Sequence, residues 1–138
     1  MKIIGLEKLR RRLERIPAEV RKRTKAELML QAREINMLQR SLAPKDDLTL
    51  AGTIRSEAMP EPDIGVVIRA GGRATTKPVR NSEKGNSPEY DYALAQEFGT
   101  EEMPANPFFF PAIQVSRKKA KRRIRAAARR ALKTAGSK

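Results

Sequence analysis

The aromatic side chains of this chain are confined to one short segment. All six, four Phe and two Tyr, lie between residues 90 and 110, and the chain has no Trp. Aromatic residues bury the largest apolar areas in a protein core. The remainder of the chain must therefore pack with aliphatic side chains, and we expect the aromatic segment to anchor the fold.

A length of 138 residues supports one modest core, so we expect a single domain, 1–138, with an α+β fold. In this prediction, N-terminal helices and a long basic C-terminal helix pack on a small antiparallel β-sheet. The expected parts are a helical N-terminal part (1–43), β-strands (45–70), a long polar loop (71–89), an aromatic and proline structural motif (90–112) and a basic helix (113–135).

The first forty residues have the apolar period of a helix. The stripe contains Leu6, Leu9, Leu13, Ile16, Val20, Leu28, Ile35, Leu38 and Leu42. Pro17 divides it, and proline is favoured in the first turn of a helix. We predict a short helix up to about Arg15, and a longer one that starts at Pro17 and ends before Pro44.

The apolar period shortens beyond Lys45, which favours strands. The residues concerned are Leu48, Leu50, Thr53, Ile54, Ile64, Val66 and Ile68, interrupted by the breaker Pro60-Glu61-Pro62. The segment 71–89 is rich in Gly, Asn, Ser, Thr and Lys, and a loop of this length is usually functional or disordered.

The C-terminal third predicts two helices joined by a proline-rich hinge. Residues 90–98 have helical spacing with Gly99 as the stop, and 103–111 form the hinge that carries three consecutive Phe. Residues 112–135 form a helix about 35 Å long. Its thin apolar stripe contains Ile113, Ala120, Ile124, Ala127, Ala131 and Leu132.

The net charge of +14 is unevenly distributed. Residues 1–40 carry 12 basic and 5 acidic side chains, 41–102 carry 7 and 11, and 103–138 carry 11 and none. Basic arms around an acidic centre attract polyanions, and they also allow copies of one protein to attract each other head to tail. Both interpretations stay open.

Several classes of function are disfavoured. The absence of Cys and His removes thiolate nucleophiles, Ser/His dyads and the commonest zinc ligands, so we expect no enzyme, catalytic residue, cofactor or metal. The carboxylates Glu89, Asp91, Glu97, Glu101 and Glu102 match no cation-binding spacing. No apolar run approaches the roughly 20 residues of a membrane span, so we expect no membrane partner and synthesis in the cytoplasm.

Two motifs carry a family resemblance. The run Tyr92-Ala93-Leu94-Ala95-Gln96-Glu97-Phe98-Gly99-Thr100, followed by Pro104-Ala105-Asn106-Pro107-Phe108-Phe109-Phe110-Pro111-Ala112, resembles the signature of small phage neck and minor tail proteins, which include tail-completion and tail-terminator subunits. Leu42-Ala43-Pro44 followed by Asp46 resembles a helix-ending element of that family. Here the segment 47–50 intervenes before Ala51-Gly52, where the family usually continues with Thr-Gly and Leu.

The resemblance implies a structural subunit of a head-tail neck, made in the host bacterial cytoplasm and assembled into the virion. It implies a homo-oligomeric ring, expected as a hexamer, in contact with neighbouring neck and tail-tube proteins, through which double-stranded DNA passes. The expected subunit interface contains Phe98, Gly99, Thr100, Pro107, Phe108, Phe109, Phe110 and Pro111. The expected contact between rings contains Gly71, Gly72, Arg73, Lys77, Arg80 and Lys84.

Three adjacent Phe side chains cannot all point into one core, so at least one should face another element or subunit. The competing interpretation is that an irregular backbone absorbs all three. The predicted polyanion or acidic-partner surface contains Arg117, Lys118, Lys119, Lys121, Arg122, Arg123, Arg125, Arg129 and Arg130. Its partner is duplex DNA or an acidic neighbouring subunit, unless the helix is only a solvated face.

Two other functions remain as alternatives. The first is a free, small, basic protein that binds double-stranded nucleic acid. The second, a toxin or nuclease, is the weakest because no convincing set of carboxylates presents itself.

Overall fold

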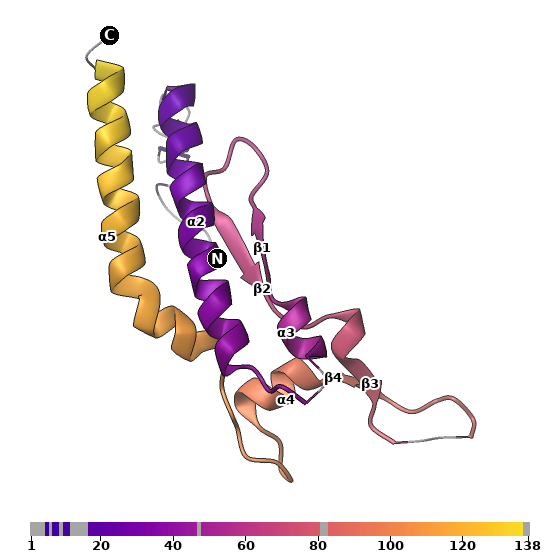
Figure 1. Ribbon diagram of the computed structural model, residues 1–138. Helices are drawn as coiled ribbons and strands as arrows, with labels where there is room; N and C mark the ends of the chain where they lie inside the picture. The colour runs from indigo at the N-terminus through magenta and orange to yellow at the C-terminus, as the bar shows by residue number, and fades with distance from the viewer. Residues whose placement is uncertain are drawn as a thin grey trace.

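The computed structural model describes residues 5, 7, 8, 10, 11, 17–46, 48–80 and 83–136. Its helices and two small antiparallel hairpins confirm the α+β class (Figure 1). The predicted short N-terminal helix lies mostly outside the described residues, including its expected end at Arg15. Within the described ranges, no helix is both long enough and apolar enough to span a bilayer.

Two long helices form the spine of the fold. Helices α2 (Ala18–Leu42) and α5 (Phe109–Gly136) run antiparallel, side by side (Figure 1). The predicted bounds of α2 at Pro17 and Pro44 are confirmed. The prediction of α5 is also confirmed, but the helix begins at Phe109, so Pro111 lies within its first turn, where proline is tolerated.

The buried face of α5 is made of small residues. Ala112, Ala120, Ala127 and Ala131 are buried, which lets the helix approach α2 closely. Leu132, which we predicted in this stripe, is exposed. The buried stripe therefore runs through the alanines and leaves the longer leucine side chain outside.

Helix α2 is covered on two sides, so residues outside its predicted apolar stripe are also buried. Besides α5, the hairpin of β1 (Arg55–Ala58) and β2 (Val66–Arg69) packs against it. Gln39 and Asn36 are buried as a result, and their amide groups donate to Phe109 O and Ser56 Oγ. The single stripe predicted for this helix was wrong at Leu42, which is exposed.

The segment before β1 is a helix, which corrects the prediction of strands there. Helix α3 (Thr49–Thr53) points Leu50 into the core, and Ile54 follows four residues later. A spacing of four suits one face of a helix, whereas the alternation of Leu48 and Leu50 suggested a strand. Strands β1 and β2 pair antiparallel, with Arg55 opposite Arg69.

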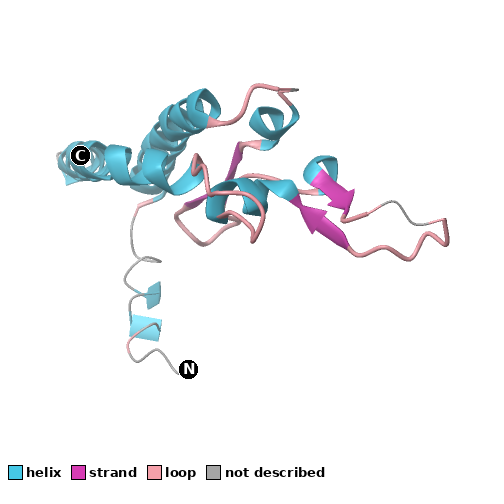
Figure 2. Ribbon diagram, turned by 90° about the horizontal axis from the view of Figure 1, so that it is seen from below, coloured by secondary structure: helices cyan, strands magenta, loops and turns pink. Residues whose placement is uncertain are grey.

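A second hairpin lies within the predicted polar loop, of which residues 79–80 and 83–88 are still a loop. After the 3-10 turn η1 (Arg73–Thr75), β3 (Thr76–Pro78) pairs antiparallel with β4 (Glu89–Asp91). Tyr90 belongs to β4, so helix α4 (Tyr92–Phe98) is shorter than predicted. Figure 2 shows this hairpin projecting away from the helices. The two hairpins are separate, so the single small sheet that we expected is divided in two.

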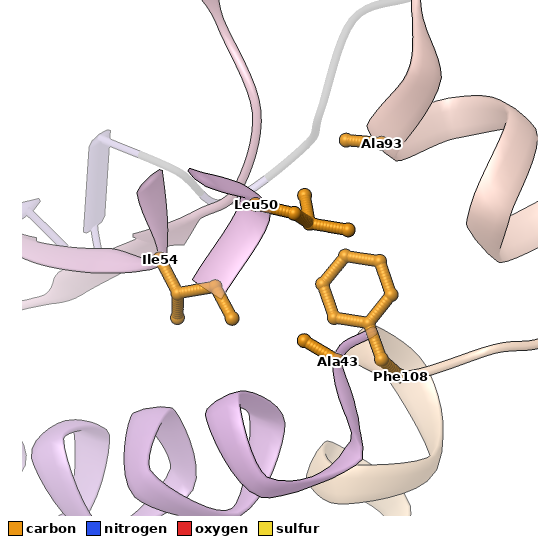
Figure 3. Close-up of a cluster of buried hydrophobic side chains, with 5 residues drawn as sticks. All are labelled: Ala43, Leu50, Ile54, Ala93 and Phe108. Carbon is orange, nitrogen blue, oxygen red and sulfur yellow. The ribbon is translucent and has the colours of Figure 1, made fainter. Parts of the chain in front are cut away.

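The core lies where the ends of α2, α3, α4 and α5 meet. Ala43, Leu50, Ile54 and Ala93 surround the ring of Phe108, as Figure 3 shows. Phe108 is 1 % exposed and is among the largest fully buried side chains of the described chain. The prediction that the aromatic segment anchors the fold is confirmed in this residue.

Ion pairs join the β1–β2 connection to α2. The Glu61 carboxylate accepts a hydrogen bond from Lys25 Nζ and lies 4.0 Å from the Arg21 guanidinium. The Lys25 hydrogen bond holds the pKa of Glu61 below its ordinary value of 4.5. A hydrogen bond from Arg55 likewise lowers the pKa of Glu57.

A pH titration tests the Glu61 contact. Because its pKa is lower in the folded state, the contact stabilises the fold above the ordinary pKa and is lost as the pH falls through the lowered value. We expect NMR titration of the Glu61 carboxyl carbon to give a midpoint below 4.5, and Lys25→Met to return it toward that value. Identical midpoints in the two proteins would show that Lys25 has no such effect.

Candidate assembly surface

A buried carboxylate organises the start of α5. Glu97 lies at the C-terminal end of α4 and is 7 % exposed. Its Oε2 accepts from the backbone N–H groups of Phe108 and Phe109 at 2.8 and 2.9 Å, and its Oε1 accepts from Phe110 N–H at 3.0 Å. A negative charge that accepts three hydrogen bonds at a helix N-terminus both satisfies free donors and complements the helix dipole.

The connection from α4 to α5 folds back on α4. Gly99 N–H donates to Ala95 O, Asn106 N–H donates to Gln96 O, and the Gln96 side chain donates to Asn106 O. Gly99 has a φ of 77°, and a Cβ there would lie 2.7 Å from Ala105 N. Only glycine fits this turn without displacement of the backbone.

The three consecutive Phe residues have three different environments. Phe108 is in the core, Phe109 is half-buried, and Phe110 is 48 % exposed. The interpretation that the monomer absorbs all three is therefore wrong. Phe108 cannot reach a partner in this conformation, so we remove it from the predicted interface.

An exposed aromatic patch results, which we define as Leu94, Phe98 and Phe110. Leu94 and Phe98 are 62 % and 65 % exposed. The rings of Phe98 and Phe110 lie 6.2 Å apart, and Phe110 also meets Phe109 edge to face at 5.2 Å. The patch borders an open groove of about 470 Å³, with Arg55 and Arg69 among its lining residues.

The other predicted interface residues surround this patch in different roles. Thr100 and Pro107 are exposed, and Pro111 is half-buried in the first turn of α5. Thr100 exchanges two hydrogen bonds with Met103, which closes a compact turn. These residues shape the connection between α4 and α5, while Phe98 and Phe110 offer apolar surface.

Asp91 plays a similar role at the base of the projecting hairpin. Its Oδ1 accepts from Thr75 Oγ1 at 2.6 Å and from Ala93 N–H at 2.9 Å, and its Oδ2 accepts from Gly72 N–H at 2.9 Å. Gly71 is buried with a φ of 82°, and a Cβ there would lie 2.5 Å from Asp91 Oδ2. Gly71 is thus a structural residue, not part of a contact between rings.

The remaining residues of the predicted inter-ring surface are exposed. Arg73, Arg80 and Lys84 lie on or near the projecting hairpin. Lys77 Nζ lies 4.9 Å above the Tyr92 ring, a cation–π contact that joins β3 to α4. Lys77 therefore also has a role within the subunit.

All nine predicted basic residues of α5 are exposed. Two of them are partly neutralised, because Lys119 and Arg123 pair with Glu34 of α2 at 3.1 and 3.2 Å. In the described chain, no salt bridge joins the other seven to an acid. These two pairs join α5 to α2.

Sequence reasoning missed the roles of Asp91 and Glu97. The position of Asp91 immediately before the helical pattern was a usable signal, since Asp is a preferred N-cap residue. Glu97 gave no local signal, because its partners lie eleven to thirteen residues later.

Comparison with known proteins identifies no relative of this chain. No family model matches the chain, and searches of curated proteins and of solved structures give no match either.

Proposed function

We propose that this protein is a structural subunit of the neck of a phage or phage-like particle, where copies form a ring that joins head and tail and through which DNA passes. The motif resemblance is the origin of the proposal. The observation that carries it is the aromatic patch, because a small chain gains nothing from exposing Leu94, Phe98 and Phe110 unless a partner covers them.

The residues around the patch hold it in one conformation, which favours its recognition by a partner. The Glu97 hydrogen bonds fix the backbone of residues 108–110, and the aromatic contacts fix the ring of Phe110. A patch that is already ordered loses little conformational entropy on association. Its aromatic composition is also typical of interface centres.

The partner that the ring requires is a second copy of this chain. A cyclic ring joins two different surfaces of neighbouring copies, so the aromatic patch of one subunit would meet another face of the next. The projecting hairpin, with Arg73, Arg80 and Lys84, would extend toward a neighbouring ring or tail-tube protein. Neither contact requires chemistry at a catalytic centre.

Substitution of Phe110 tests the ring. In Phe110→Asp, a charge replaces an exposed apolar ring, so we expect loss of self-association with little change in the melting temperature. Native mass spectrometry over a range of concentrations should show closed oligomers for the original protein and monomers for the variant. The matched control is Met37→Asp on α2, an exposed apolar residue outside the groove lining, which should still assemble.

Two results would contradict the proposal. One is an original protein that stays monomeric at every concentration and is also monomeric when bound to a phage neck. The other is a Phe110→Asp variant that assembles normally. An unfolded variant would instead place Phe110 in the core, which its exposure argues against.

A further inference from the structure

The far side of α5 carries a column of positive charge. Helical periodicity places side chains at intervals of three or four residues on one face. Residues at this spacing, opposite the buried alanines, are Lys118, Arg122, Arg125, Arg129 and Lys133. We call these five residues the cationic column. It extends about 22 Å along the helix, at 1.5 Å per residue.

The column differs from the two paired cations of α5. Lys119 and Arg123 are directed toward Glu34 of α2, whereas no salt bridge of the described chain involves a residue of the column. Figure 1 shows α5 at the outer edge of the two-helix spine, and all five side chains of the column are exposed. The five cations are therefore accessible together on one face of the helix.

Like charges at this spacing repel one another along a helix. The helix forms in spite of this, because Ala112, Ala120, Ala127 and Ala131 pack against α2 and alanine has the highest helix propensity. The repulsion disappears when an extended polyanion binds along the column. A duplex offers one phosphate charge per about 1.7 Å, so a segment as long as the column presents more than enough partners.

We propose that the cationic column is a binding site for the phosphate backbone of double-stranded nucleic acid, without sequence preference. Lys and Arg bind phosphate as donors and charges, and the column carries no aromatic side chain that could stack on unpaired bases. This site goes beyond ring formation and does not depend on it, because a single subunit already carries the whole column.

The site makes a quantitative prediction about salt. If about five phosphates are neutralised, the slope of log K against log salt should be about −4.5 for duplex DNA. Affinity should then fall about 500-fold between about 50 mM and about 200 mM salt. Two duplexes of the same length and unrelated sequence should bind equally.

The test uses fluorescence anisotropy with a short labelled DNA duplex and two charge-matched variants. Arg122→Gln, Arg125→Gln and Arg129→Gln together remove three cations from the column, which should reduce the slope to about −1.8. The control combines Arg73→Gln, Arg80→Gln and Lys84→Gln on and near the projecting hairpin, and it should keep the original slope. Far-ultraviolet circular dichroism checks that both variants are folded.

Three results would overturn the site: no duplex binding at low salt, equal losses in the two variants, or a column variant that binds normally. A column variant that binds DNA normally but self-associates less would assign the column to an acidic surface of a second copy. All titrations are repeated in Phe110→Asp, which the ring proposal predicts to be monomeric. Binding that persists there separates the DNA site from ring formation, so either proposal can fail alone.

Discussion

Replacement of Glu97 by alanine is expected to lower the free energy of unfolding by about 3 kcal/mol, because three backbone N–H groups lose their acceptor at once. Phe108 N–H is buried, and the N–H groups of Phe109 and Phe110 are partly buried, so water replaces the carboxylate incompletely. The N-terminus of α5 also loses a complementary negative charge. The melting temperature should fall by about 10 °C.

Two further variants separate the capping role from a general effect of charge. Glu101→Ala removes an exposed carboxylate from the same connection and should change stability by less than about 0.5 kcal/mol. Glu97→Gln keeps one oxygen acceptor but turns an amide NH₂ toward the backbone donors, so it should lie between the alanine variant and the original protein. Urea unfolding followed by circular dichroism measures all three. Equal stability of Glu97→Ala and Glu101→Ala would refute the capping role.

Replacement of Phe108 by alanine is expected to cost about 3–5 kcal/mol, the usual loss for a buried aromatic side chain. The ring fills the space between Ala43, Leu50, Ile54 and Ala93 (Figure 3), and two of these four neighbours are alanines that cannot extend into the cavity. The ends of several elements would lose their common contact. We therefore expect a large drop in the urea midpoint, measured by the same method.

The matched control is Phe110→Ala, two residues away in the same run. Because Phe110 is 48 % exposed and lies outside the core cluster, its loss should cost no more than about 1 kcal/mol. If Phe110→Ala were as damaging as Phe108→Ala, the division into a core ring and a surface ring would be wrong. The pair thus tests the assignment on which the proposed interface depends.

Local signals were sufficient where the cause of a structure is local. Helix α2 begins after Pro17 and ends before Pro44, as predicted, since a proline restricts itself and the residue before it. The alanine-rich sequence predicted α5 because alanine has the highest helix propensity, and Gly99 ends α4 where expected. The exposed part of the Phe run was foreseeable too, because consecutive side chains diverge.

The prediction was wrong where the same residues fit both the apolar period of a strand and that of a helix. Leu48 and Leu50 alternate like a strand, while Leu50 and Ile54 share a helical face, and burial against Phe108 selects the helix. The polar segment 71–89 has no apolar alternation that could reveal β3 and β4. Its order comes partly from the Asp91 carboxylate, which joins Gly72, Thr75 and the start of α4.

The sequence by itself determined the spine of this protein: two long helices, both ends of α2, and a C-terminal helix with many cations and no acid. Only the tertiary structure decided which Phe is core and which is surface, and which cations are paired with Glu34 and which form the column. The physical reason is the separation along the chain over which each effect acts. Propensity and proline sterics act between neighbours in the chain, whereas burial and ion pairing depend on residues brought together from distant segments.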